Sequence, residues 1–219
     1  MMQWMVRVLA LLVMSSTAHA GDWQAQQEFP GIEADQGVMR AVKQAEAAYD
    51  KGDFKRALWL YEKRLVSVGD KFAQYTVGYM HAMGEGTARD PEAAAAWFLL
   101  AAERGHPKLV ANSQQALEAL SPAARDRARE QAEELRAEYG DQQLLTRLLR
   151  ADKQKMREQT GSRSGTCNQP GRITLTGDEA KSQSISVKHF CEVMKARIAA
   201  REAYLEQYTV HGDLDASTG

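Results

Sequence analysis

The chain has 219 residues, of which 44% are hydrophobic and 7% aromatic, so it is long enough for one domain of ordinary core size plus an appendage. Its 28 Lys and Arg residues nearly balance its 29 Asp and Glu residues. Because an extended nucleic-acid surface needs a clear basic excess, we expect no nucleic-acid partner.

The N-terminus has the pattern of a secretory signal peptide. Arg7 supplies a positive charge, Val8–Met14 an apolar core, and Ala18-His19-Ala20 a small-residue cleavage site. A short membrane anchor is the alternative, although the apolar run is far below the ~20 residues of a membrane span. We expect cleavage after Ala20, export, no membrane span in the mature protein, and an irregular lead-in over residues 21–37.

The segment from Ala73 to Pro107 reads as two short helices joined by a turn. The first helix ends at Gly84-Glu85-Gly86. The second begins at Asp90-Pro91, because Asp caps free backbone N–H groups and Pro fits the first helical turn. Gly105 ends it. Its apolar residues recur at spacings of three and four and form one stripe: Ala93, Ala96, Trp97, Leu100 and Ala101. The segment is therefore predicted to be an αα-hairpin.

One hairpin cannot bury its own apolar face, so copies are expected beside it. A shift of 36 positions toward the N-terminus places similar residues on this pattern: Ala57 on Ala93, Leu60 on Ala96, Tyr61 on Trp97, Leu65 on Ala101 and Gly69 on Gly105. The same shift in the other direction finds a degenerate copy, in which Gln114 occupies the place of Gly78.

These residues carry a resemblance to a known repeat. The residues in question are Tyr79, Gly84, Gly86, Asp90, Ala93, Trp97, Ala101, Ala102 and Gly105, and they resemble the Sel-one-like repeat. The segment Ala48–Leu65 is similar to the related tetratricopeptide repeat. The resemblance implies an all-α fold, a short right-handed solenoid of αα-hairpins over residues 38–158, in an exported bacterial protein of the periplasm. The resemblance also implies that the protein functions as an adaptor or scaffold.

The remaining helices follow from periodicity and end signals. Val38–Tyr49 and Phe54–Val68 form the upstream pair, with Asp53 as a cap. Lys108–Leu120 and a charged helix that begins at Ser121-Pro122 follow the central hairpin. Gly140 ends the charged helix, and the next helix runs to about Glu158.

Residues 159–210 form a second region, which begins with a Ser/Gly/Thr-rich loop. Two short alternating runs around Ile173 and Ile185 fit either a small β-hairpin or irregular loops. The last helix is expected to run from about Val187 to Tyr208, and residues 211–219 to form a disordered tail.

Cys167 and Cys191 are the only cysteines, and an even count in an exported chain favours a disulfide between them. Two buried thiols or an intermolecular bridge remain open. His189 and Cys191 project about 200° apart on a helix, so they cannot act as a nucleophile pair. Together they make only half of a metal-ligand set.

No other group of residues indicates a catalytic or ligand-binding site. Gly84-Glu85-Gly86 lacks the residues that complete a phosphate loop, and His81 and His106 lie in repeat turns without a fixed partner. We therefore expect no catalytic residues, no metal and no cofactor.

The expected function is protein interaction through the concave side of the solenoid, formed by the first helix of each pair. The candidate partner-binding residues are Arg40, Lys43, Gln44, Gln74 and His81. The leading hypothesis is an exported, non-catalytic adaptor or scaffold that binds a peptide or protein.

Two alternatives remain open. One is a cell-envelope hydrolase of the β-lactam-handling type, whose relatives carry a Cys pair in each repeat, whereas the repeats here carry none. The other is a structural peptidoglycan-associated protein, although no row of sugar-stacking aromatic residues is evident.

Overall fold

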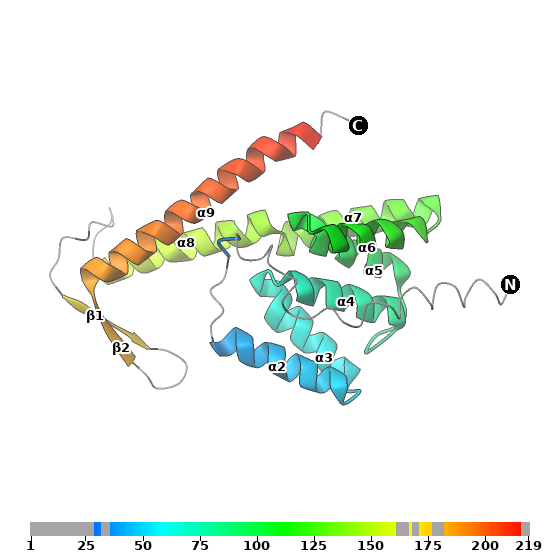
Figure 1. Ribbon diagram of the computed structural model, residues 1–219, viewed down its shortest axis with the longest axis horizontal. Helices are drawn as coiled ribbons and strands as arrows, with labels where there is room; N and C mark the ends of the chain where they lie inside the picture. The colour runs from blue at the N-terminus through cyan, green and yellow to red at the C-terminus, as the bar shows by residue number, and fades with distance from the viewer. Residues whose placement is uncertain (1–28, 32–35, 161–166, 168–170, 177–181, 216–219) are drawn as a thin grey trace.

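The computed structural model describes residues 29–31, 36–160, 167, 171–176 and 182–215, and the predicted signal peptide lies outside them. Helices make up most of the described chain, and two strands form its sheet (Figure 1). The predicted all-α class with a small β-hairpin is confirmed. In chain order the elements are α2 (Gln36–Asp50), α3 (Phe54–Leu60), η3 (Tyr61–Leu65), η4 (Val66–Val68), α4 (Lys71–Met83), α5 (Pro91–Ala101), η5 (Ala102–Arg104), α6 (Pro107–Glu118), α7 (Pro122–Tyr139), α8 (Asp141–Thr160), β1 (Arg172–Thr176), β2 (Ser182–Ser186) and α9 (Val187–Asp215).

The first hairpin pairs α2 with the helical segments from Phe54 to Val68. Small buried residues recur at spacings of three and four along α2, which lets α3 approach closely: Ala41, Ala45 and Ala48. The periodicity predicts one continuous helix after Asp53. Instead, α3 passes into the π-helical η3 and the 3-10 turn η4, and both Leu65 and Val66 are buried there. The segment ends at Gly69, whose φ of 79° lies in the left-handed region.

The central hairpin, α4 and α5, has the predicted ends. The Asp90 side chain accepts hydrogen bonds from the backbone N–H groups of Glu92 and Ala93, and Pro91 opens α5. Asp70 caps α4 in the same way, a cap that the sequence reasoning did not assign. Gly84 and Gly86 turn the chain between the helices with φ values of 77° and 78°.

A glycine also sets the distance between these two helices. A Cβ atom on Gly78 would lie 2.8 Å from the Phe98 ring and 3.1 Å from the Ala94 carbonyl oxygen. No side chain fits there without movement, so α4 and α5 pack with their backbones close together.

The repeat core lies around α5, which packs against α4, α6 and α7. Trp97 is buried, as predicted, and its ring centroid lies 5.9 Å from that of Tyr139 on α7. One continuous cluster joins both hairpins and consists of Ala41, Ala45, Ala48, Ala57, Leu58, Leu60, Tyr61, Leu65, Val66, Ala73, Val77, Met80, Trp97 and Leu100. The two pairs therefore fold around a shared core, as stacked repeats do.

Gly140 ends α7 as predicted. α8 continues from the end of α7, and α9 packs along α8 (Figure 1). α9 is longer than predicted and continues to Asp215, through part of the expected tail. The helix passes through Gly212, so this glycine does not act as the stop signal that its residue type suggests.

β1 and β2 form the β-hairpin that the alternating runs left open. They pair antiparallel, with Ile173 opposite Ile185. Ile173 is buried with Val187, Phe190, Cys191 and Met194 in a second, smaller cluster. The hairpin is therefore anchored on the first turns of α9.

Candidate functional site

Three of the five predicted partner-binding residues lie on the exposed side of α2. Arg40, Lys43 and Gln44 are exposed, while Ala41 and Ala45 between them are buried. The exposed and buried positions alternate with the period of a helix that packs on one side only. These three side chains therefore form one polar surface on α2, as the sequence suggests.

Gln74 cannot belong to this surface, and the expectation that its side chain is exposed is wrong. Its side chain is 0% exposed. Ala73 and Val77, on the same helix, are also 0% exposed, so this face of α4 packs inward. Within the part of the chain that the structure describes, neither polar atom of the Gln74 amide has a hydrogen-bond partner. The polarity of Gln suggested an exposed position, but packing of α4 against its neighbours decided otherwise.

His81 lies on α4 and not on α2. α2 and α4 both pack against η3. His81 is half-buried, and its Nε2 atom lies 4.0 Å from the Glu62 carboxylate of η3. The structure therefore places His81 beside an acidic residue of the preceding hairpin rather than within the α2 surface.

Sequence reasoning missed three exposed apolar side chains in the repeats. Trp59 on α3 is 53% exposed, Met39 on α2 is 48% exposed, and Met83 at the end of α4 is 44% exposed. A signal was present for Trp59, because it falls outside the stripe formed by Ala57, Leu58, Tyr61 and Leu65. A large apolar residue off the buried stripe of a helix points outward, and Trp and Met are enriched in protein interfaces.

The turn between α4 and α5 is tied to the first hairpin. Tyr49 Oη, at the end of α2, donates a hydrogen bond to Glu85 Oε2 at 2.7 Å. Burial and the Glu85 carboxylate together raise the pKa of the Tyr49 phenol. Glu85 therefore has a structural partner within the repeats, which agrees with the interpretation of Gly84-Glu85-Gly86 as a turn.

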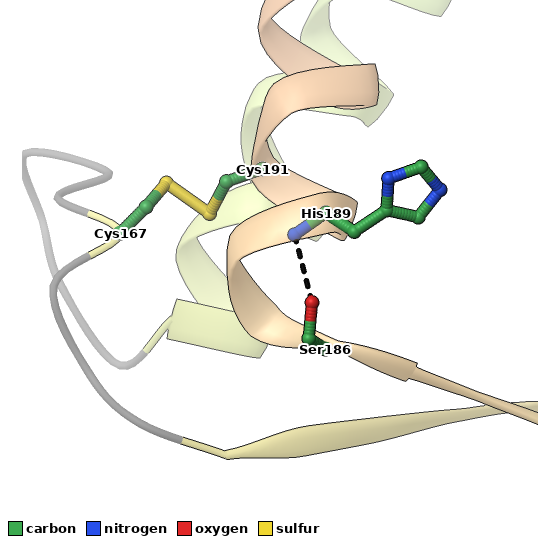
Figure 2. The surroundings of a disulfide bond; sticks show 4 residues. All are labelled: Cys167, Ser186, His189 and Cys191. Atoms are coloured by element: carbon green, nitrogen blue, oxygen red, sulfur yellow. Dashed lines mark hydrogen bonds between the residues drawn. A yellow bond between two sulfur atoms is a disulfide. The ribbon is translucent and has the colours of Figure 1, made fainter.

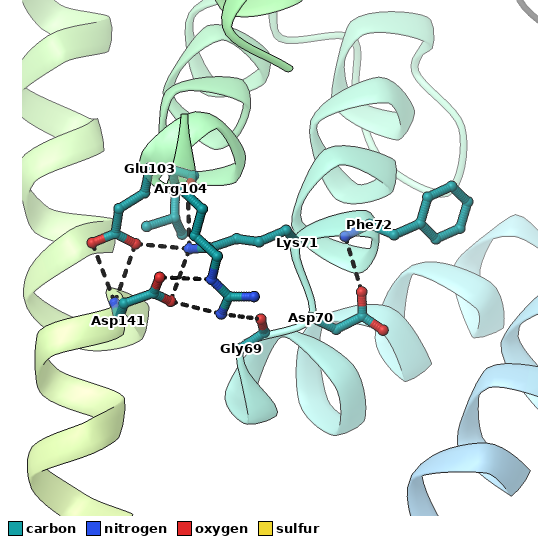
Figure 3. Close-up of polar contacts among 8 residues, drawn as sticks. Gly69, Asp70, Lys71, Phe72, Glu103, Arg104 and Asp141 are labelled. Carbon is teal, nitrogen blue, oxygen red and sulfur yellow. Dashed lines mark hydrogen bonds and ion pairs between the residues drawn. The ribbon is translucent and has the colours of Figure 1, made fainter. Parts of the chain in front are cut away.

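A buried ionic network, which the sequence reasoning did not foresee, lies where the repeats meet α8 (Figure 3). Lys71 Nζ lies 2.7 Å from Glu103 Oε2 and 3.2 Å from Asp141 Oδ1. Arg104 donates two hydrogen bonds to the Asp141 carboxylate, from Nε at 2.7 Å and from Nη2 at 2.8 Å. Lys71 is 1% exposed and Asp141 is 0% exposed. Two cations and two carboxylates thus satisfy one another away from solvent.

The same network holds helix ends in place. The Glu103 carboxylate accepts the backbone N–H of Asp141, the first residue of α8, and Arg104 donates to the Gly69 carbonyl oxygen at 2.9 Å. Burial raises the pKa of the neighbouring Asp70 carboxyl, while the two N–H groups that it caps and the charge of Arg104 oppose that shift. Because every charge has partners that join helix ends, we assign the network a structural role.

Cys167 and Cys191 form the predicted intramolecular disulfide, with a Cα–Cα distance of 6.1 Å (Figure 2). This pairing excludes the alternatives of two buried thiols and an intermolecular bridge. The His189 side chain points away from Cys191, and its backbone N–H bonds to Ser186 Oγ at 3.1 Å. The geometry therefore agrees with the prediction that His189 and Cys191 form no nucleophile pair.

Among the described residues, no group of three or more His, Cys, Asp or Glu side chains is arranged to hold a metal ion. No described helix is both long and apolar enough to cross a membrane.

Comparison with known protein families matches the central hairpin. Residues 71–106 match the family model of the Sel1 repeat, a span that covers α4, α5 and the turn before α6. No curated protein and no solved structure matches the chain. Sel1 repeats are generally protein-interaction modules and are generally non-catalytic. The α4–α5 hairpin therefore matches the Sel1 repeat, the Sel-one-like repeat that its residues resemble.

Proposed function

We propose that this protein is an exported, non-catalytic adaptor that binds a peptide or protein partner through the outer surface of its helical repeats. The observation that carries the proposal is the composition of the exposed side chains of the first hairpin, together called the first hairpin surface: Met39, Arg40, Lys43 and Gln44 on α2, and Trp59 on α3. These side chains are exposed although the core beneath them is filled with alanines and leucines. Arg, Trp and Met are the residue types that protein interfaces favour, and Trp and Arg contribute most often to hot spots.

Export is proposed on two independent grounds. The first residues have the charge, apolar core and cleavage site of a signal peptide, with Ala20 as the last residue removed. The Cys167–Cys191 disulfide suits an oxidising compartment, since such bonds are rare in the reducing cytosol. A bacterial periplasm satisfies both.

The test changes the first hairpin surface without touching the core. We would replace Arg40 and Lys43 with Glu and Trp59 with Ala, then recover partners from intact cells by cross-linking and affinity purification. We expect the unchanged chain to retain one stoichiometric exported protein, and the triple variant to lose it while its circular dichroism spectrum stays the same.

A matched control places the same charge change elsewhere. Lys188 and Lys195 are exposed on α9, so replacing both with Glu alters the net charge equally but leaves the repeats untouched. This control should retain the partner. Equal binding by the triple variant and the control would reject the first hairpin surface. Turnover of a β-lactam or a glycan by the pure protein would reject the adaptor.

A further inference from the structure

The lead-in contributes three described residues, Phe29, Pro30 and Gly31, which lie far in sequence from the groups that hold them. Arg201 on α9 donates a hydrogen bond from Nε to the Pro30 carbonyl oxygen at 2.9 Å. It also donates from Nη2 to the Gly31 carbonyl oxygen at 2.6 Å. Both contacts are made to main-chain carbonyl oxygens. They would therefore also form with another segment whose backbone had the same conformation.

The Phe29 ring supplies the side-chain part of the contact. The guanidinium carbon of Arg104 lies 3.6 Å from the centroid of the ring, in cation–π geometry. The Tyr204 ring of α9 meets it edge-on, with centroids 5.3 Å apart and planes at 84°. A repeat residue and an α9 residue thus hold one aromatic side chain between them.

Contacts with α8 fix the orientation of the Arg201 guanidinium. Arg201 is 4% exposed, and its Nη1 group donates to the Asp152 carboxylate and to the Leu148 carbonyl oxygen, both on α8. Arg197 also binds Asp152, at 2.9 and 2.6 Å. Because Asp152 and Leu148 fix one side of the guanidinium, its Nε and Nη2 groups are oriented toward the peptide carbonyls before any ligand arrives.

The bound segment also has sequence requirements. Gly31 N–H donates to the Phe29 carbonyl oxygen at 2.8 Å, which closes a tight turn. A Cβ atom on Gly31 would lie 2.2 Å from the Phe29 ring, so the ring can fold over this position only if it is glycine. An aromatic residue, Pro and Gly in this order fit the contacts.

We propose that Arg104, Tyr204 and Arg201 form a peptide-recognition site for an aromatic-Pro-Gly segment, and that the chain's own Phe29-Pro30-Gly31 is an intramolecular ligand that a partner's segment of the same chemistry replaces. This site is distinct from the first hairpin surface, and the proposal does not depend on partner binding there. The chain between Gly31 and α2 is only four residues long, so the tethered segment has an effective concentration of roughly millimolar, and free peptide competes poorly while it is in place.

The test uses a fluorescent synthetic peptide with the sequence QEFPGIEA, which corresponds to residues 27–34. It is added to the whole chain that carries Phe29→Ala, and binding is followed by fluorescence anisotropy. Because the altered resident segment has lost its ring, we expect the variant to bind at least tenfold more tightly than the unchanged chain. A peptide with Ala in place of Phe should not bind, and Tyr204→Ala added to the variant should weaken binding several-fold. Lys195→Ala, an exposed change on the same helix, should have no effect.

A second measurement covers the case in which Phe29→Ala disturbs folding. The same peptide, with a photoreactive benzoylphenylalanine in place of Phe, is irradiated at high concentration with the unchanged chain. Cross-links are expected near Arg104 and Tyr204, and unlabelled QEFPGIEA should suppress them. The proposal would be overturned if the folded Phe29→Ala variant did not bind the peptide, or if the Ala peptide bound equally well. Cross-links distributed over other parts of the chain would overturn it too. Partner capture through the first hairpin surface would be unaffected by any of these results.

Discussion

In the repeats, from α2 to α7, one continuous cluster of buried apolar side chains joins successive hairpins. The C-terminal region, from α8 to α9, buries a smaller cluster around Ile173 and Phe190 and adds a disulfide and the ion pairs of Asp152. Apolar burial is the main stabilising contribution in the first region, beside the buried Lys71–Glu103 ion pair. The second region also depends on charged contacts and on a covalent bond, which reduction can break.

The largest expected effect comes from removing the central anchor of the repeats. Trp97 is 8% exposed and contacts both the shared core and Tyr139. Trp97→Ala should lower the free energy of unfolding by about 3–5 kcal/mol, measured by urea denaturation. Trp59→Ala is the matched control, because the Trp59 side chain is 53% exposed and its loss should change stability by no more than about 0.5 kcal/mol.

This pair of variants tests whether the repeats owe their stability to apolar burial. Similar losses for Trp97→Ala and Trp59→Ala would contradict that account. A strong effect of Trp97→Ala on the α8–α9 region alone, seen as protease cleavage there while the repeats stay intact, would contradict it as well.

The second prediction concerns the disulfide, which should matter for the C-terminal region only. Cys167 and Cys191 are separated by 24 residues of sequence, and closing such a loop stabilises by roughly 3.5 kcal/mol in the chain-entropy model. Cys191→Ser, or reduction, should therefore expose β1, β2 and the start of α9 to protease, while α2 to α7 stay protected. His189→Ala, which leaves the bond intact, is the control.

Thiol titration completes this test. Protein isolated from the oxidising compartment should show no free thiol after denaturation. Two titratable thiols would refute the bond in the exported protein. An unchanged digestion pattern after reduction would mean that the cluster around Phe190 holds the region without the bond.

Much of the repeat fold could be predicted because each local signal agreed with the packing around it. Asp90, Pro91 and the positive-φ glycines at 84, 86 and 105 define the ends of the helices, and the stripe through Trp97 defines the buried side. The disulfide followed from the count of cysteines. These features depend on local chemistry or on a single possible pairing, so one sequence suffices.

Gln74 and the ionic network show where such reasoning fails. Polarity predicts exposure, yet Gln74 and Lys71 are buried because α4 packs inward and because Lys71 meets carboxylates 32 and 70 positions away along the chain. Whether a charged residue is paired depends on distant segments, and helical periodicity carries no information about them. The contact of Arg201 with the lead-in joins residues 171 positions apart, so it could not be predicted from the sequence for the same reason.

The smallest of the three effects should come from the network that joins the two regions, and it tests whether they are independent. Asp141→Asn leaves the shape of the side chain but removes the buried carboxylate that both Lys71 and Arg104 contact, while Lys71 keeps its ion pair with Glu103. An uncompensated buried cation is costly, while the amide oxygen still accepts one hydrogen bond, so we expect a loss of about 2–3 kcal/mol. Asp126→Asn, whose exposed carboxylate pairs with Arg129 on the surface of α7, should cost almost nothing and is the matched control.

The distribution of the loss is more informative than its size. Lys71 and Glu103 belong to the repeats and Asp141 begins α8, so the variant should raise amide hydrogen exchange in α4, η5 and the first turn of α8 together. Added salt should not restore stability, because solvent ions screen a buried pair poorly. If exchange rises in α8 alone, or if Asp126→Asn costs as much, the junction does not couple the regions. The contrast between an apolar repeat region and a polar, cross-linked C-terminal region would then describe two separately stable units.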